Sequence, residues 1–232
     1  MSDRSSAGGH PESSGDTDSC GGDAGAVLDD LPQLHYWRGS QRVGGLNRMI
    51  GERIITELGR YDSPRIVETG AGATTLLFCC LEPDAVTSIA PDDALRDRIL
   101  TEASAREISV EPLRFFCERS EIVLPRLAAD GEEFHAALID GSHSWPSVFV
   151  DFCYMNMMLR SGGTLFVDDV QLYSVAQLYF LLRQQREFEY VALDRKLATF
   201  RKLTDRPFLS ELRRQPYLRQ NTVFEPGRSE LK

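Results

Sequence analysis

The chain contains 232 residues, of which 42% are hydrophobic, and its formal net charge at pH 7 is −9. A chain of this length is expected to form one medium-sized domain with a substantial core. The excess of acidic residues disfavours binding to the phosphate backbone of nucleic acids. No apolar run approaches the roughly 18 residues that a membrane-spanning helix needs. Neither a nucleic acid nor a membrane is therefore expected as a partner.

The cysteines and the N-terminus indicate the compartment. The five cysteines form an odd set without a C-x-x-C pair, which disfavours a disulfide framework and a zinc site. The N-terminus lacks the basic segment followed by an apolar one that is typical of a secretory signal. These features predict a cytoplasmic protein with reduced thiols.

Composition divides the chain into three parts. Residues 1–26 consist almost wholly of small and polar residues, so they are predicted to form a disordered tail. Residues 27–203 are predicted to form the folded domain, and 204–232 a C-terminal extension. The extension mixes arginine with apolar residues and could dock on the domain or on a second subunit, so a homo-oligomer is compatible with the sequence.

In chain order, the first predicted element is a helix over 46–58, where apolar residues recur at helical spacing. Seven short apolar runs are then predicted as strands, at 65–68, 85–90, 113–117, 136–140, 164–168, 188–193 and 197–201. Helix-length segments separate the earlier strands, at about 74–81, 91–106, 119–129, 145–159 and 171–186. This alternation predicts an α/β fold with a doubly wound, mostly parallel, seven-stranded sheet. Only three residues join the last two runs, which therefore should form an antiparallel hairpin.

Ligands of open α/β sheets bind at the carboxyl ends of the strands. Most of the suggestive polar residues and glycines fall at those ends: Glu68, Gly70, Gly72, Asp92, Glu118, Asp140, His143, Asp168 and Asp169. This coincidence predicts a functional site along one rim of the sheet.

The first feature of this rim is the glycine turn that follows the first strand of the sheet. Gly70 and Gly72 allow a backbone to pass close to a ligand. A dinucleotide-binding turn would have glycine at position 75, where this chain has Thr75. Glu68 would lie badly near a pyrophosphate and suits a ligand with an ammonium or sulfonium charge. The simpler alternative is a tight turn in which glycine serves packing alone.

Two segments resemble a known family. Glu68-Thr-Gly-Ala-Gly72 resembles the first motif of class I S-adenosylmethionine (AdoMet) methyltransferases. Residues 137–169, with Ile-Asp-Gly-Ser-His at one end and Gly-Gly-Thr-Leu-Phe-Val-Asp-Asp at the other, resemble small-molecule O-methyltransferases and macrocin-type relatives. The resemblance runs from about Leu46 to Lys202 and implies a Rossmann-like methyltransferase fold that binds AdoMet.

The resemblance also implies where the cofactor binds. The implied contacts are Glu68, Gly70, Ala71, Gly72, Thr74, Asp92, Glu118 and Asp140. The family commonly has an acid at the end of the second strand to bind the ribose, whereas this chain has Ala90. Asp92, two residues further on, is the candidate replacement.

A second constellation consists of Asp140, Asp168 and Asp169, on adjacent strand ends. Carboxylates so placed repel one another unless a cation or a proton intervenes. Mg²⁺ takes oxygen ligands and keeps room for a substrate oxygen, and acids at matching positions hold such an ion in the resembling enzymes. The alternative is that these aspartates only cap helices or bind backbone amides.

His143 lies three residues after Asp140. In the resembling enzymes this place often holds the general base, and a histidine can accept a hydroxyl proton at neutral pH. His143 and Asp140 are therefore the predicted catalytic residues, and the alternative for His143 is a surface histidine bonded to its own loop.

These features together predict an AdoMet-dependent methyltransferase that acts on a hydroxyl group of a small molecule, assisted by Mg²⁺ or another divalent metal. A metal-dependent hydroxylase on the same scaffold is one alternative. A non-catalytic AdoMet-binding domain is another, and Ala90 favours it. An NAD-dependent oxidoreductase is disfavoured by Glu68 and Thr75.

Overall fold

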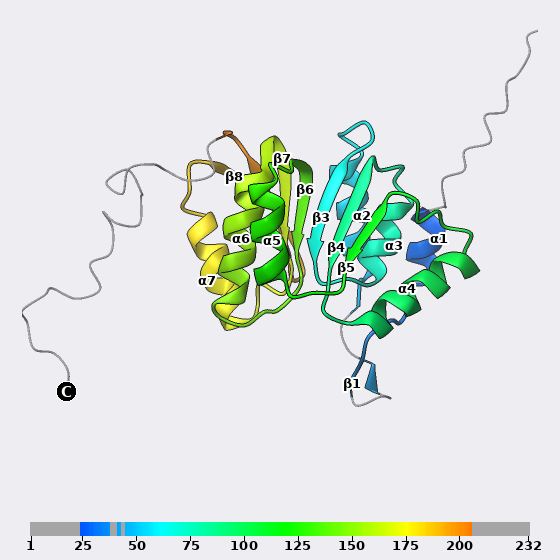
Figure 1. The fold of residues 1–232 in the computed structure, drawn as a ribbon. Helices are drawn as coiled ribbons and strands as arrows, with labels where there is room; N and C mark the ends of the chain where they lie inside the picture. The colour runs from blue at the N-terminus through cyan, green and yellow to red at the C-terminus, as the bar shows by residue number, and fades with distance from the viewer. Residues whose placement is uncertain (1–23, 38–40, 43–44, 206–232) are drawn as a thin grey trace, which may run out of the picture.

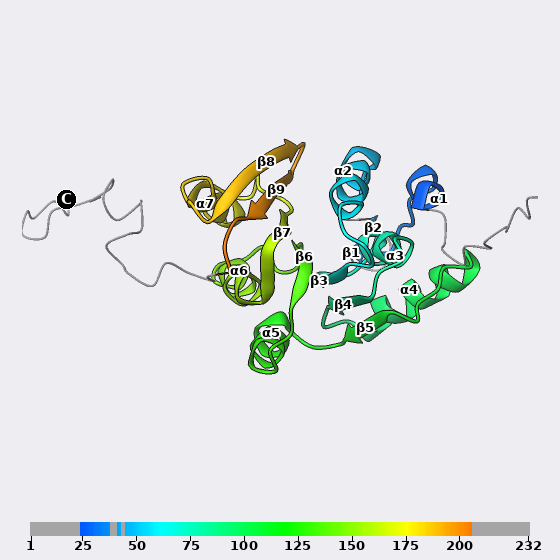
Figure 2. The ribbon, with the colours of Figure 1, turned by 90° about the horizontal axis from the view of Figure 1, so that it is seen from above.

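The computed structural model describes residues 24–37, 41–42 and 45–205. They form a seven-stranded sheet between two layers of helices (Figures 1 and 2). The strands are β3 (Arg65–Thr69), β4 (Ala85–Ile89), β5 (Leu113–Phe116), β6 (Phe134–Ile139), β7 (Leu159–Val167), β8 (Phe188–Asp194) and β9 (Leu197–Lys202). Their order across the sheet is β5-β4-β3-β6-β7-β9-β8. Strands β3 to β7 pair in parallel, and β9 runs antiparallel to both β7 and β8. The doubly wound sheet with a terminal antiparallel hairpin is thereby confirmed.

The helices cover both faces of the sheet. One face carries α1 (Ala24–Asp29), α2 (Arg48–Leu58), α3 (Ala73–Cys79) and α4 (Asp93–Ala105). The other face carries α5 (Ser120–Ala129), α6 (Ser147–Met158) and α7 (Tyr173–Leu182), which lie together in Figure 2. A two-stranded ribbon of β1 (Tyr36–Trp37) and β2 (Gln41–Arg42) stands apart from the main sheet.

The central strands are apolar on both sides because helices cover both. In β3, Ile66 packs with the α1–α4 layer and Val67 with the α5–α7 layer. In β6, Leu138 and Ile139 divide between the two layers in the same way. Since successive side chains of a strand point to opposite faces, each strand contributes to both cores. This two-sided burial fixes the strand ends, and therefore the rim where the predicted site lies.

The predicted tail boundary differs from the structure. Helix α1 begins at Ala24, inside the segment 1–26 that composition assigned to the tail. The helix is held by Val27 and Leu28, which are buried, and Leu28 packs directly over Gly51 of α2. Composition did not predict this short helix, because only two of its residues are buried apolar residues and the segment before it is small and polar. Residues 1–23 and 206–232, the rest of the predicted tail and nearly all of the predicted extension, lie outside the described residues.

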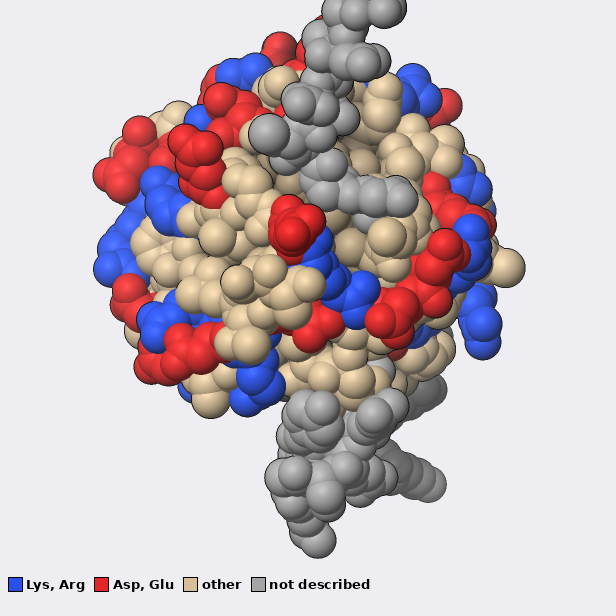
Figure 3. Space-filling model, turned by 90° about the vertical axis from the view of Figure 1, so that its right-hand side faces the viewer, with Lys and Arg blue, Asp and Glu red and all other residues tan. Residues whose placement is uncertain are grey.

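The described surface bears both signs of charge. In Figure 3, basic and acidic side chains lie side by side. Helices α1 and α4 are linked by Arg106 and Asp30, whose charged atoms lie 3.1 Å apart, and α1 and α2 by Arg48 and Asp29. None of the helices in the described part of the chain is long and apolar enough to cross a membrane.

Candidate functional site

The turn between β3 and α3 depends on Gly70. Its φ of +78° lies in the left-handed region, and a Cβ built there would run into the backbone carbonyl of Asp140. The Gly70 N–H donates to the Ile89 carbonyl at 3.0 Å. Gly70 therefore lets the ends of β3, β4 and β6 meet, and no residue with a side chain fits there without displacing backbone.

Glu68 lies beneath this turn and is fully buried. Its carboxylate accepts hydrogen bonds from the hydroxyls of Thr74, Thr75 and Ser88 at 2.7, 2.5 and 2.6 Å. Burial raises the pKa of Glu68 to about 7, although the three hydroxyls lower it. The Thr75 hydroxyl also accepts from the Gly72 N–H at 3.0 Å. Glu68 thus holds the turn from below. Its side chain is not among those that line the large cavity at this rim.

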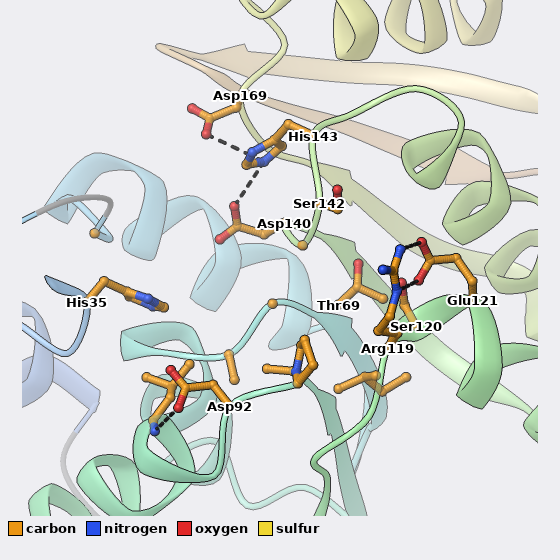
Figure 4. Close-up of a pocket in the computed structure, with 18 of the residues that line it drawn as sticks. His35, Thr69, Asp92, Arg119, Ser120, Glu121, Asp140, Ser142, His143 and Asp169 are labelled. Carbon is orange, nitrogen blue, oxygen red and sulfur yellow. Dashed lines mark hydrogen bonds and ion pairs between the residues drawn. The ribbon is translucent and has the colours of Figure 1, made fainter. Parts of the chain in front are cut away.

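A cavity of about 610 Å³ opens at the carboxyl ends of the strands (Figure 4). Its volume is typical of small-molecule sites. Six of the predicted site residues line it: Gly70, Ala71, Asp92, Asp140, His143 and Asp169. Five of the predicted residues are not among its lining residues: Glu68, Gly72, Thr74, Glu118 and Asp168. The structure thus brings together the glycine turn and three of the six predicted acidic residues around one cavity.

Gly72 and Thr74 have roles beside the cavity. A Cβ on Gly72 would lie 2.8 Å from Nε2 of His35, and His35 itself lines the cavity. Thr74 binds Glu68 and lines a second cavity of about 20 Å³. Both residues therefore support the cavity wall rather than form it.

Asp92 follows β4 and lies across the cavity from His143 (Figure 4). It caps α4 by accepting from the Leu95 N–H at 2.9 Å, and its other oxygen lies 3.5 Å from Arg98. Ala90 is buried and donates its N–H to the Phe116 carbonyl at 3.1 Å. Asp92 thus places a carboxylate at the cavity edge, two residues after Ala90.

Glu118, a predicted cofactor contact, is not among the residues that line the cavity. Its carboxylate pairs with Arg126 of α5 at 2.7 Å and lies outside the cavity. The next three residues, Arg119, Ser120 and Glu121, line the cavity instead. Arg119 and Ser147 both bind Glu121 at 2.8 Å, and these contacts lower the pKa of Glu121 to about 2. The strand ends at Phe116 and α5 begins at Ser120, which turns this short segment towards the rim.

Asp140, His143 and Asp169 converge on one side of the cavity (Figure 4). Nε2 of His143 lies 3.6 Å from Oδ1 of Asp140 and 3.5 Å from Oδ2 of Asp169. Asp169 has a φ of +55°, a left-handed conformation that is uncommon for a residue with a side chain. The carboxylate of Asp140 raises the pKa of His143 above its ordinary value, and partial burial only partly offsets this.

Asp168 departs from the predicted acidic triad. It is buried, and its Oδ2 accepts from the Lys196 ammonium at 2.7 Å. Lys196 also lies 3.0 Å from Oδ1 of Asp169. Burial and the nearby charge of Asp140 raise the pKa of Asp168 to about 6, although Lys196 lowers it. The charge repulsion argued from the sequence is therefore partly relieved by a lysine that sequence reasoning missed.

The geometry changes the set of residues suited to a metal. One ligand atom from each of Asp140, His143 and Asp169 lies within 4.8 Å of the others, whereas Asp168 is not part of this group. Nε2 of His143 is buried and has no hydrogen-bond partner among the described residues. Two carboxylates and an open imidazole nitrogen form a donor set that fits a divalent cation.

Comparisons with known proteins agree with this architecture. Residues 67–170, slightly under half of the chain, match a family model described as a methyltransferase domain. An rRNA methylase from Streptococcus thermophilus matches 69% of this chain and 100% of its own, with 15% identity and a TM-score of 0.54. The chain has the fold of the class I methyltransferases. No curated protein matches its sequence at a significant level.

Two further structures share this methyltransferase fold. A Staphylococcus aureus protein assigned as a caffeoyl-CoA O-methyltransferase is 15% identical, with 69% of this chain and 86% of that one covered and a TM-score of 0.57. The methyltransferase MycE of the mycinamycin biosynthetic pathway, solved in complex with Mg and S-adenosylhomocysteine (SAH), is also 15% identical. That match covers 75% of this chain and 55% of MycE, with a TM-score of 0.52. At these identities the likeness concerns the fold.

Proposed function

We propose that this protein transfers a methyl group from AdoMet to a hydroxyl group of a small molecule. The observation that carries the proposal is the single cavity that joins the Gly70 turn to Asp140, His143 and Asp169 (Figure 4). The turn allows the cofactor to approach the backbone, and Asp92 lies where it can accept from ribose hydroxyls. The other side of the cavity offers a proton acceptor and two carboxylates.

The reaction needs little covalent chemistry from the protein. The acceptor oxygen forms a bond to the methyl carbon of the sulfonium, the carbon–sulfur bond breaks, and SAH leaves. The hydroxyl proton passes to Nε2 of His143, which has no hydrogen-bond partner among the described residues. Asp140 and Asp169 face that nitrogen and stabilise the imidazolium that forms. Alignment of donor and acceptor supplies much of the rate.

The proposal includes a divalent cation that assists the transfer. If His143 accepts the proton, its nitrogen is not free for a metal, so Asp140 and Asp169 would hold the ion. Mg²⁺ is commonly held by one or two carboxylates together with waters and substrate oxygens. When bound, such an ion lowers the pKa of the acceptor hydroxyl and fixes its orientation.

The loops beside His143 and Asp169 support a small organic acceptor. Trp145 is 76% exposed and Tyr173 is 83% exposed, although both are large apolar residues. The Ser174 hydroxyl donates to the His143 carbonyl, so the start of α7, which carries Tyr173, is joined to the loop that carries Trp145. Exposed aromatic side chains are typical of ligand-binding surfaces, and these two lie within four residues of His143 or Asp169, which line the cavity. An RNA acceptor would require a basic surface, whereas the chain carries a net charge of −9.

Replacing Trp145 by alanine is expected to raise KM for an aromatic acceptor about three- to tenfold with little change in kcat, because the ring contributes binding alone. Catechol is a suitable first probe, assayed with tritiated AdoMet. Phe180→Ala is the matched control, since Phe180 is also exposed but lies further along α7. Equal effects of the two substitutions would show that Trp145 does not contact the acceptor.

The experiment that tests the proposal is methyl transfer from tritiated AdoMet to a panel of small hydroxylated compounds, catechol among them. His143→Gln should lower transfer about 10²- to 10⁴-fold while SAH still binds. Oxygen consumption with hydroxylated products and no labelled product would favour the hydroxylase alternative. SAH binding with no transfer to any acceptor in the panel would favour a non-catalytic binding domain.

A further inference from the structure

Lys196 lies in the turn between β8 and β9, at the same rim as the acidic residues. Strand β9 pairs antiparallel with β7, with Ala198 opposite Val167. Continuing this register places Lys196 opposite Asp169, and the Lys196 carbonyl accepts from the Val170 N–H at 3.1 Å. The turn is therefore fixed to the end of β7 by its backbone.

The Lys196 ammonium binds two carboxylates at once. It lies 2.7 Å from Oδ2 of Asp168 and 3.0 Å from Oδ1 of Asp169, and it also lines the large cavity. These carboxylates raise the pKa of Lys196, although burial lowers it, so the side chain stays charged at neutral pH. Only Oδ2 of Asp169 faces His143, at 3.5 Å.

We propose that Lys196 is a permanent cation of this site, which limits the affinity of the site for a divalent ion. The inference rests on the proposed function only for the idea that a divalent ion binds beside His143. Asp140, Asp168 and Asp169 carry three negative charges, and Lys196 compensates one of them. Any divalent ion in the cavity meets this ammonium as a neighbouring like charge.

Two consequences follow for binding. With Lys196 in place, an ion has Asp140 and one oxygen of Asp169 available. Without Lys196, Oδ1 of Asp169 keeps only the hydrogen bond from the Gln171 amide at 2.8 Å, and a repelling positive charge is removed from the cavity wall. Because attraction between charges is strong in a partly buried site, affinity for a divalent ion should rise at least about tenfold.

The test is calorimetric titration of the full chain with MnCl₂ alone, followed by MgCl₂. Lys196→Met should bind Mn²⁺ at least about tenfold more tightly than the unmodified chain. Arg195→Met is the matched control: it removes the same charge from the same turn, and it should leave the affinity unchanged. Lys196→Arg keeps the charge and should retain the low affinity. Thermal unfolding of each variant verifies that it is folded.

The outcomes separate this inference from the proposed function. If the unmodified chain binds no Mn²⁺ but Lys196→Met does, the inference holds and metal assistance of the reaction fails. If Lys196→Met binds no more tightly than the unmodified chain, or if neither binds, the inference is overturned. A rise of equal size in Arg195→Met would also overturn it, because the effect would then reflect net charge alone. Should Lys196→Met not fold, Lys196→Gln serves in its place with the same expected result.

Discussion

Replacing Gly70 by alanine is expected to abolish SAH binding and to destabilise the fold by about 3 kcal/mol or more. A left-handed conformation costs an alanine about 1 kcal/mol. The larger part of the cost arises because the new Cβ would overlap the carbonyl of Asp140, so the ends of β3 and β6 must separate. Since both strand ends line the cavity, its shape changes as well. Urea unfolding and calorimetry with SAH measure the two effects.

Gly131 provides the control for Gly70. Its φ is +73°, close to that of Gly70, but a Cβ there would meet nothing within 4 Å. Gly131→Ala should therefore cost only the backbone strain of about 1 kcal/mol and leave SAH binding intact. If both variants lose the same stability and both bind SAH, the close approach of Gly70 to Asp140 has no functional importance.

Replacing Glu68 by alanine is expected to cost about 3 kcal/mol and to weaken SAH binding. The substitution leaves three buried hydroxyls, those of Thr74, Thr75 and Ser88, without their common acceptor. It also releases the Gly72 end of the turn, which Thr75 holds. Urea unfolding at pH 5 measures the loss, and Glu68→Gln, which preserves the size of the side chain, should lose much less.

The pH dependence of the free energy of unfolding provides a second test of the role of Glu68. Its pKa of about 7 in the fold lies above the ordinary glutamate value of 4.5, so the folded state binds the proton more tightly than the unfolded state. The stability that this proton contributes is complete below pH 4.5 and is lost as the pH rises through about 7. Glu68→Gln should remove this part of the pH dependence. Identical slopes between pH 5 and 8 in both proteins would contradict the role given to Glu68.

Much of the fold could be predicted because its signals are local. The strands of the sheet are short apolar runs separated by helical segments, and the two residues between β8 and β9 allow only a hairpin. Helix α1 was not predicted, because its two buried apolar residues, Val27 and Leu28, stabilise it only by packing against α2 and α3. Its stability comes from packing rather than from its own sequence.

The site was predictable as a rim but not in its individual contacts. Parallel strands end at the same edge, which is why Gly70, Asp140 and Asp169 meet. Asp168 and Asp169 look alike in sequence, but only Asp169, whose backbone is left-handed, is among the residues that line the cavity. Lys196 depends on the register between β7 and β9, which no local pattern encodes.

A similar cause explains why Arg119, Ser120 and Glu121 line the cavity whereas Glu118 does not. The carboxylate of Glu118 forms an ion pair with Arg126 of α5, and this contact exists only after α5 has formed. The sequence did not predict the three hydroxyl groups that bind Glu68. Thr75 stood out only as a departure from a dinucleotide-binding pattern, whereas its hydroxyl joins Glu68 to the turn. Residues that act through buried hydrogen bonds are found from coordinates rather than from spacing.

Calorimetric titration of the full chain with SAH, and in parallel with NAD, tests the central claim most directly. The cavity beside the Gly70 turn is expected to bind one SAH per chain, and this heat should disappear in Gly70→Ala and persist in His143→Gln. NAD should give no saturable heat, because Glu68 and Thr75 replace the features of a pyrophosphate-binding turn. Saturable binding of NAD together with no binding of SAH would contradict the account.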